Sequence, residues 1–187
     1  MAKKKLAIFD MDGTLVDTKD VNYFAYREAL QEQGFDLERE YYCQYCNGRH
    51  YTTFLPPIIG DDRERLLLIH DRKKLLYHQY LEKAKVNQHL ISMMKAMKPE
   101  YYCAVVTTAS KKNCRELLDA FQLTEFFDLI LTQEDIPKKK PDPEGFFMAM
   151  RHFAIPAENT IIFEDSETGV QAAEKTGADY YVVHGYN

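Results

Sequence analysis

Two aspartates one residue apart, Asp10 and Asp12, form the pattern in this sequence with the clearest chemical meaning. They directly follow the continuous apolar run 6–9, which is typical of a buried strand. Side chains alternate along an extended chain, so both carboxylates are expected to point the same way, with Met11 opposite. Two such charges repel unless a cation or a shared proton relieves them. The pair therefore predicts a cation or proton-transfer site, with a solvated turn as the alternative.

Further polar residues stand at the ends of other predicted elements. They are Thr107 and Thr108 after the run 102–106, Glu164 and Asp165 after the run 160–163, and Lys140 just before a helical pattern that begins at Pro143. Taken alone, Thr107 fits a helix cap and Lys140 fits a solvated lysine run. Glu164 and Asp165 alone fit the acidic first turn of a helix. Their joint occurrence in this order favours one shared site.

The elements that must position these residues alternate between apolar runs and helical patterns. The predicted strands are 6–9, 102–106, 128–131, 160–163 and 179–183, and the predicted helices that accompany the later strands are 90–97, 111–121, 143–153 and 169–175. This alternation is typical of an α/β fold with a parallel sheet and right-handed crossovers. In such sheets the carboxyl ends of the strands meet at one edge, where ligands bind. The candidate residues are therefore expected to gather there.

A mostly helical module interrupts this alternation after the first strand. One helix is expected over 17–33, and a second begins at Asp61-Asp62, with Leu66, Leu67 and Ile69 on its apolar side. The segment 41–57 is expected to be irregular, because Gly48, Pro56 and Pro57 act as breakers. The predicted organisation is an α/β core, 1–16 and 84–187, with an inserted helical module, 17–83.

The predicted site would bring four carboxylates together, those of Asp10, Asp12, Glu164 and Asp165. A hard divalent cation with oxygen ligands relieves their repulsion, and Mg²⁺ leaves positions for water and a phosphate group. A threonine hydroxyl, helix N-terminal amides and the Lys140 ammonium supply donors for an anion. Together these features predict phosphoryl chemistry. A calcium loop does not fit, since Gly13 follows Asp12 directly where that loop needs further spaced acids.

The composition narrows the classes of partner. The chain has 187 residues, a net charge of −5, 45% hydrophobic and 28% charged residues. The acidic balance argues against a nucleic-acid binder, and no apolar run reaches the length of a membrane span. The run after the N-terminal lysines stops at Asp10, so no signal peptide is expected and the predicted location is the cytoplasm. Cys43 and Cys46 have the spacing of a metal or redox pair, but no second pair accompanies them.

Four segments in this order resemble the motifs of the haloacid dehalogenase superfamily, on its phosphatase side. They are Phe9–Thr18, Val106–Thr108, Lys140–Pro143 and Glu164–Gly169. The resemblance covers the whole chain, and the helical module is similar to the cap of the β-phosphoglucomutase-like and phosphoglycolate-phosphatase-like branch. It implies a Rossmann-like parallel sheet core with an inserted helical cap domain.

The resemblance also implies an activity, that of a Mg²⁺-dependent phosphatase acting on a small phosphomonoester through an aspartyl-phosphate. Asp10 would be the nucleophile, and Asp12 the general acid and then the general base. The phosphoryl group would be held by Thr107, Thr108 and Lys140, and the metal by Asp10, Glu164, Asp165 and the backbone carbonyl of Asp12. True dehalogenases lack the second aspartate, so Asp12 argues against that reaction.

The inserted module bears on the alternatives within the family. A β-phosphoglucomutase-like sugar-phosphate mutase shares the core machinery, but such mutases carry a histidine where this chain has Asn22. Phosphonatases use a cap lysine, which is absent from the expected substrate loop around Gly48, Arg49 and His50. Intact Asp10 and Asp12 speak against a non-catalytic binding protein. The sequence names neither the substrate nor the oligomeric state.

Overall fold

The computed structural model describes residues 3–185 of the chain. These residues divide into two compact units. The sheet unit comprises the described residues up to Asp17 and from Lys85 onward, and the helical unit is Thr18–Ala84. Each unit has a hydrophobic core of its own. The functional division into a catalytic core and a cap stays a prediction.

A five-stranded parallel sheet with the order β5-β4-β1-β6-β7 forms the centre of the sheet unit. Its strands are β1 (Lys5–Phe9), β4 (Tyr101–Val106), β5 (Leu129–Leu131), β6 (Thr160–Glu164) and β7 (Asp179–Val182). The predicted α/β fold and its five strands are confirmed. Because β1 lies between β4 and β6 and all three run parallel, the segments that follow them meet at one edge.

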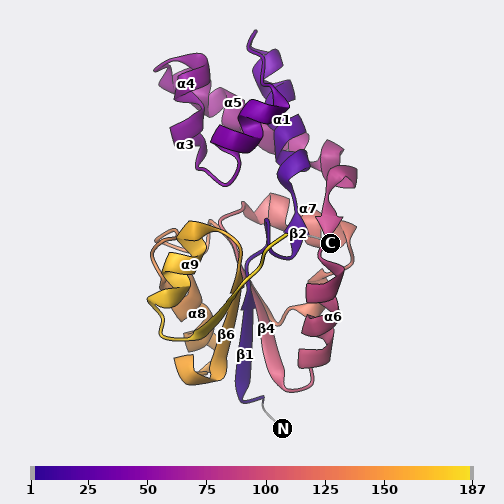
Figure 1. The fold of residues 1–187 in the computed structure, drawn as a ribbon, viewed down its shortest axis with the longest axis vertical. Coiled ribbons are helices and arrows are strands. Elements are labelled where there is room, and N and C mark those ends of the chain that lie inside the picture. Colours follow the sequence, from indigo (N-terminus) through magenta and orange to yellow (C-terminus); the bar gives the residue numbers. More distant parts are fainter. Residues whose placement is uncertain (1–2, 186–187) are drawn as a thin grey trace. The chain divides into compact units, whose positions relative to one another are not determined.

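Helices cover both faces of this sheet. They are α6 (Gln88–Met97), α7 (Lys111–Ala120), α8 (Glu144–Phe153) and α9 (Glu167–Glu174), with short 3₁₀ turns η3 (Thr124–Phe126) and η4 (Ala157–Asn159). Figure 1 shows α6 on the opposite side of the sheet from α8 and α9. Leu6 and Ile8 pack with Phe146 of α8 and Ala172 of α9 in one fully apolar layer. Burial on both faces explains why β1 is continuously apolar rather than alternating.

Side-chain caps begin several of these helices. Ser110 accepts a hydrogen bond from the N–H of Asn113 at the start of α7, and Ser166 accepts one from Gly169 in α9. Asn87 caps α6 in the same way. Such caps satisfy N–H groups that have no partner inside the helix. A two-residue antiparallel ribbon of β2 (Val16–Asp17) and β3 (Lys85–Val86) is too short for any periodicity to reveal it.

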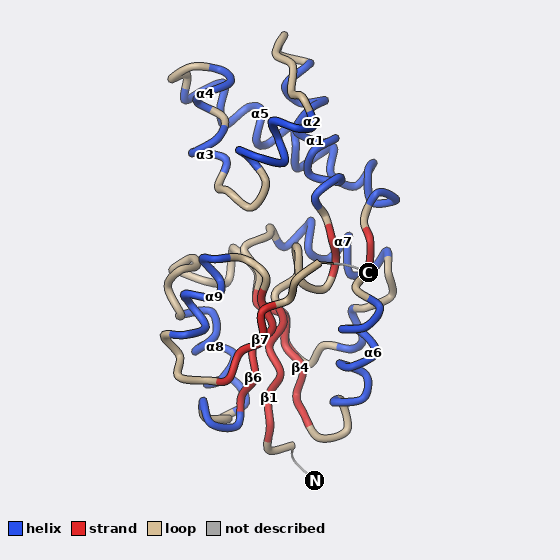
Figure 2. Tube along the Cα trace, in the orientation of Figure 1, coloured by secondary structure: helices blue, strands red, loops and turns tan. Residues whose placement is uncertain are grey.

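The helical unit is built on two long helices, α1 (Lys19–Gln31) and α5 (Arg63–Leu76), which contact each other. The shorter elements are α2 (Arg39–Tyr41), the π-helix η1 (Tyr42–Cys46), α3 (Tyr51–Phe54), α4 (Pro56–Ile59) and the 3₁₀ helix η2 (Tyr77–Lys83). Figure 2 shows helices and loops in this unit. None of the helices in residues 3–185 is long and apolar enough to span a membrane.

Two expectations for the helical unit are wrong. The segment 41–57 is largely helical: it contains η1 and α3, and Pro56 occupies the first turn of α4, where proline is favoured, whereas residues 47–50 around Gly48 do interrupt the helices. Leu67 is 45% exposed, whereas Leu66 and Ile69 are buried. Lys73 is buried in the same helix, with its ammonium over the rings of Tyr26 and Tyr77. The buried face of α5 therefore carries a cation that periodicity of apolar residues does not show.

Candidate active site

Asp10 is the first residue after β1 and is almost completely buried. Its backbone N–H donates to the carbonyl of Phe163 in β6 at 2.9 Å, which extends the ladder between the strands by one residue. Met11, the next residue, is fully buried. The Asp10 carboxylate thus lies at the edge of the sheet, and a hydrogen bond to β6 fixes the backbone of Asp10.

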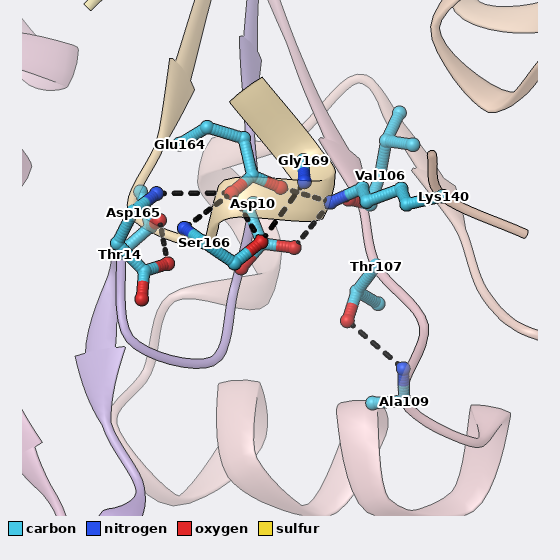
Figure 3. A network of polar contacts seen from close by, with 10 residues as sticks. All are labelled: Asp10, Thr14, Val106, Thr107, Ala109, Lys140, Glu164, Asp165, Ser166 and Gly169. Atoms are coloured by element: carbon cyan, nitrogen blue, oxygen red, sulfur yellow. Dashed lines mark hydrogen bonds and ion pairs between the residues drawn. The ribbon is translucent and has the colours of Figure 1, made fainter. Parts of the chain in front are cut away.

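Lys140 connects Asp10 to Glu164 (Figure 3). Its Nζ atom donates to Asp10 Oδ1 at 2.6 Å, to the carbonyl of Val106 at 3.1 Å and to Glu164 Oε1. The side chain is 8% exposed, although its neighbours Lys138 and Lys139 are exposed. Lys140 is therefore not part of a solvated run; it is a buried ammonium paired with two carboxylates.

Glu164, the last residue of β6, is fully buried, and both of its carboxylate oxygens accept hydrogen bonds from protein donors. Oε1 receives the Lys140 ammonium, and Oε2 accepts from the N–H of Asp165 at 2.9 Å, and from the N–H and hydroxyl of Ser166 at 3.0 Å each. A Cβ on Gly169 would lie 1.9 Å from the Glu164 carboxyl carbon. Glycine at 169 therefore makes room for this carboxylate under α9.

Burial dominates the electrostatics of the cluster. It raises the pKa of Asp10 well above the usual range, against the lowering effect of Lys140, and Glu164 and Asp165 add to the rise. Burial likewise raises the pKa of Asp165 to about 6, with Glu164 adding to it. The pKa of Lys140 lies above its usual value, because its two carboxylate partners outweigh the burial that would lower it. One ammonium thus does not compensate three clustered carboxylates.

A divalent cation fits this arrangement. Asp10, Glu164 and Asp165 each offer one carboxylate oxygen, and the three oxygens lie within 4.8 Å of one another. Among residues 3–185 this is the one group of three or more His, Cys, Asp or Glu with such spacing. An all-oxygen, anionic donor set suits a hard cation such as Mg²⁺. Glu164 is engaged by several donors, and which of the three acids bind a metal stays a prediction.

The other predicted core residues lie at the same edge of the sheet. Thr107 follows β4, is 1% exposed, and its hydroxyl accepts from the N–H of Ala109 at 3.0 Å. A hydroxyl that accepts a bond still has a proton to donate to an anion. Thr108 is exposed, and Asp12 is partly buried in the turn that leads from β1 to β2. Their roles stay predictions.

Two residues near the acids are absent from the predicted site. Thr14 donates its hydroxyl to Asp165 Oδ1 at 2.7 Å, and Ser166 donates its N–H and hydroxyl to Glu164. The signals for them are weak, because a serine before a helix indicates a cap and a Gly-Thr pair indicates a turn. Neither pattern says which distant carboxylate the hydroxyl will meet.

The three candidate substrate residues of the helical unit lie in the loop between η1 and α3. Gly48 has a φ of +75°, which places it in the left-handed region that favours glycine. Arg49 and His50 are exposed, and His50 Nδ1 contacts the hydroxyl of Thr52 at 2.7 Å. In α1, Asn22 donates its side-chain amide to the carbonyl of Thr18 at 3.0 Å. Roles in substrate recognition stay predictions for all of these residues.

Three of the four cysteines are buried thiols. All four are free, and only Cys43 is exposed. Burial raises the pKa of Cys46 and Cys103 to about 11 each. Burial, with smaller contributions from Asp12 and Asp10, raises the pKa of Cys114 to about 12. Since the thiolate is the reactive form, these three buried thiols are inert near neutral pH.

Comparison with known proteins gives a consistent group of relatives. The model of the haloacid dehalogenase-like hydrolase family matches residues 7–183. A phosphorylated carbohydrates phosphatase of Thermotoga maritima is 27% identical over 188 residues, which cover 96% of this chain and 86% of that protein. A phosphoglycolate phosphatase of Pseudomonas savastanoi pv. phaseolicola is 29% identical over 194 residues, which cover 98% and 71%. The structure of CbbY from Rhodobacter sphaeroides in complex with phosphate has a TM-score of 0.83 and 25% identity, covering 97% and 87%.

Proposed function

The chain belongs to the haloacid dehalogenase-like hydrolase family, and from this premise we propose that it is a Mg²⁺-dependent phosphatase for a small phosphomonoester. One observation carries the proposal. A buried carboxylate, Asp10, stands at the carboxyl end of the central strand, held by the ammonium of Lys140 at 2.6 Å. Such a group is preorganised for attack on phosphorus, and names of relatives such as phosphorylated carbohydrates phosphatase and phosphoglycolate phosphatase support the substrate class.

The proposed reaction has two steps. An oxygen of Asp10 forms a bond to phosphorus while the bond to the leaving oxygen breaks, and Asp12 gives that oxygen a proton. Water then attacks the phosphorus of the aspartyl-phosphate, gives a proton to Asp12 and releases inorganic phosphate with the Asp10 carboxylate restored. Splitting one displacement into two lets one acid–base group serve both halves.

The remaining residues bind and orient. Lys140 donates to Asp10 in the free protein, and in the complex its ammonium would neutralise charge on the phosphoryl oxygens. The buried Thr107 hydroxyl would donate to the same group. Asp10, Asp165 and the backbone carbonyl of Asp12 would hold Mg²⁺. Glu164, which pairs with Lys140, would assist them. When bound, the metal would supply neutralisation of charge on the transferred phosphoryl group.

A phosphate-release screen tests the proposal. The purified chain with Mg²⁺ is offered p-nitrophenyl phosphate, phosphoglycolate and a panel of sugar phosphates that includes fructose 1-phosphate, a substrate named for a relative in Escherichia coli. We expect release of inorganic phosphate from at least one compound. Isomerisation of a sugar phosphate that needs a bisphosphate activator, with little free phosphate, would identify the mutase instead. No turnover of any compound would contradict both.

The metal requirement gives a first prediction. Chelation with EDTA should abolish phosphate release, and added Mg²⁺ should restore it. Asp165→Ala should raise the Mg²⁺ concentration for half-maximal activity by about tenfold or more. Glu164→Ala should raise it less but should lower the melting temperature more, because the donors that Glu164 satisfies would lose their acceptor. Full activity after exhaustive chelation would refute the metal role.

A second prediction concerns the loop of the helical unit. If Arg49 contacts the leaving group, Arg49→Ala should raise KM for the best substrate by about tenfold, with little loss of kcat. The effect should be smaller on p-nitrophenyl phosphate, which lacks the polar groups of a sugar. Arg63→Ala, which removes another exposed arginine of the same unit, is the control. Equal kinetics of Arg49→Ala and wild type on both substrates would show that Arg49 has no such role.

A further inference from the structure

The Asp165 carboxylate is held by a residue outside the predicted site. The hydroxyl of Thr14 donates to Asp165 Oδ1 at 2.7 Å, across a separation of 151 residues in the sequence. Thr14 is fully buried, and Asp165 is partly buried. Figure 3 shows the two side chains facing each other beside Asp10. The contact joins the turn after β1 to the turn after β6.

Gly13 brings these two turns close enough for the bond. Its φ is +92°, and a Cβ at this position would lie 2.1 Å from Asp165 Oδ2. The carboxylate therefore packs directly against the backbone of the turn, and only glycine leaves the space. A hydrogen bond from Thr14 thus holds Asp165 Oδ1 in place, and packing against the Gly13 backbone restricts the position of Oδ2.

The turn that carries Thr14 is itself firmly held. The N–H of Gly13 donates to the carbonyl of Val16 at 2.8 Å, and the N–H of Leu15 donates to the carbonyl of Met11 at 3.0 Å. From outside the turn, the side-chain amide of Asn87 donates to the carbonyl of Thr14 at 3.3 Å. The backbone of Thr14 is thus fixed in position, so its hydroxyl can orient a hydrogen-bond partner.

The two acids at the end of β6 are restrained in different ways. Glu164 is engaged on both oxygens, by Lys140 and by the donors at the start of α9. Asp165 lies within 4.8 Å of the other acids, and a neutral hydroxyl, that of Thr14, donates to its Oδ1. An oxygen that accepts one hydroxyl bond keeps a lone pair for a cation.

We propose that Thr14 is a positioning residue whose hydroxyl orients Asp165 as a ligand for the divalent cation, in the space that Gly13 provides. The inference rests on the metal site of the proposed function and deepens it. Hydrogen bonds from second-layer residues fix the rotamer of a ligating carboxylate, and their loss typically weakens metal binding by about 10–100-fold. Thr14 therefore acts on the metal through Asp165 and does not touch the reacting atoms.

The test measures metal binding without substrate. Mn²⁺ binding to the metal-free protein is followed by electron paramagnetic resonance for wild type, Thr14→Val and Thr14→Ser. Valine has the shape of threonine without the hydroxyl, so Thr14→Val should weaken Mn²⁺ binding by about tenfold or more. Thr14→Ser keeps the donor and should bind Mn²⁺ much as wild type does. Phosphatase activity of Thr14→Val should largely return at saturating metal, because the catalytic groups are unchanged.

Thr160→Val is the matched control. Thr160 is also a buried threonine, but its hydroxyl donates to the carbonyl of Pro156 at the far end of β6. The substitution removes a buried hydroxyl without touching the acids, so it should leave Mn²⁺ affinity unchanged. Thermal melts establish that each variant is folded. If Thr14→Val does not fold, Thr14→Ala removes the same donor with less steric demand and carries the test.

The outcomes separate this inference from the proposed function. The inference would be overturned if folded Thr14→Val bound Mn²⁺ as tightly as wild type, or if Thr14→Ser lost as much Mn²⁺ affinity as Thr14→Val. Neither result would contradict the proposed phosphatase function. Absence of Mn²⁺ binding to wild type would overturn it as well. Thr14-dependent Mn²⁺ binding in a chain that hydrolyses no phosphate ester would support the inference and contradict only the proposed function.

Discussion

Replacing Asp10 with asparagine is expected to lower phosphatase turnover by a factor on the order of 10⁴ or more while leaving the fold intact. The neutral amide cannot attack phosphorus as a carboxylate does, so no aspartyl-phosphate forms. Asparagine has nearly the same shape, and its carbonyl oxygen can still accept the Lys140 ammonium that contacts Asp10 Oδ1 at 2.6 Å. The loss should therefore appear in kcat rather than in KM.

The same substitution should not destabilise the metal-free protein. Asp10 shares one ammonium with Glu164 and lies near Asp165, and burial raises its pKa. Removing one buried negative charge relieves repulsion among the remaining acids. The melting temperature of Asp10→Asn without metal should equal or exceed that of wild type. A variant that melts far below wild type would show that Asp10 has a structural role this cluster does not suggest.

Mass spectrometry must accompany the kinetics, because slow deamidation of asparagine would regenerate the native aspartate. Asp61→Asn serves as the handling control, since Asp61 is exposed in the helical unit and has no proposed role. It should retain wild-type turnover. Turnover near wild type in an intact Asp10→Asn sample would remove Asp10 from the role of nucleophile.

The sheet could be predicted from the sequence because burial leaves a strong local pattern. Leu6 to Phe9 form an uninterrupted apolar run, and all four residues are fully buried between helices on both faces. The parallel order then places the segments after β1, β4 and β6 at one edge. This is why residues as distant along the chain as Asp10 and Glu164 could be assigned to one site from sequence alone.

The helical unit was less predictable, because its pattern depends on contacts between short elements. Asn47 donates its N–H to the carbonyl of Tyr42 at 2.9 Å, which closes a π-helical turn that no residue preference specifies. Lys73 lies in the buried face of α5, where its ammonium contacts two tyrosine rings. Tertiary contacts of this kind override helix periodicity.

Within the site, the sequence groups Glu164 and Asp165 as similar acids, but the structure separates them. Adjacent residues at a strand end point in different directions, so each meets its own partners. Glu164 faces Lys140 and the start of α9, whereas Asp165 faces Thr14. Residue type and spacing predict that the acids lie close together. The packing of the segments after β1, around Lys140 and after β6 decides which donors each carboxylate receives.

Replacing Lys140 with methionine is expected to remove activity and also to destabilise the protein. Lys140 pairs with Asp10 and Glu164, which are 9% and 0% exposed at their side chains. Methionine has a similar length but no charge, so two buried carboxylates would lose their counter-ion. Loss of one partner of a buried ion pair typically costs about 3–5 kcal/mol. Urea denaturation of the metal-free protein measures this loss, and Lys139→Met, at an exposed neighbouring lysine, is the control.

The loss of stability in Lys140→Met should grow as the pH rises. The Lys140 ammonium lowers the pKa of Asp10, so its removal raises further a pKa that burial already holds above the usual range. A carboxyl whose pKa is raised on folding stabilises the folded state when protonated and costs stability as it ionises. The difference in stability between wild type and Lys140→Met should therefore widen as the pH rises through the range in which Asp10 ionises. A constant difference at all pH values would contradict the unpaired charge as its cause.

The double variant Lys140→Met with Glu164→Gln separates stability from catalysis. Glutamine keeps an oxygen for the donors at Asp165 and Ser166 but carries no charge, so one of the two unpaired carboxylates disappears. Stability should recover in part relative to Lys140→Met, whereas phosphatase activity should not, because the ammonium that would hold the phosphoryl group is still missing. Recovery of both would show that Lys140 serves only to balance buried charge, and the anion site would then rest on Thr107 and the backbone amides after β4.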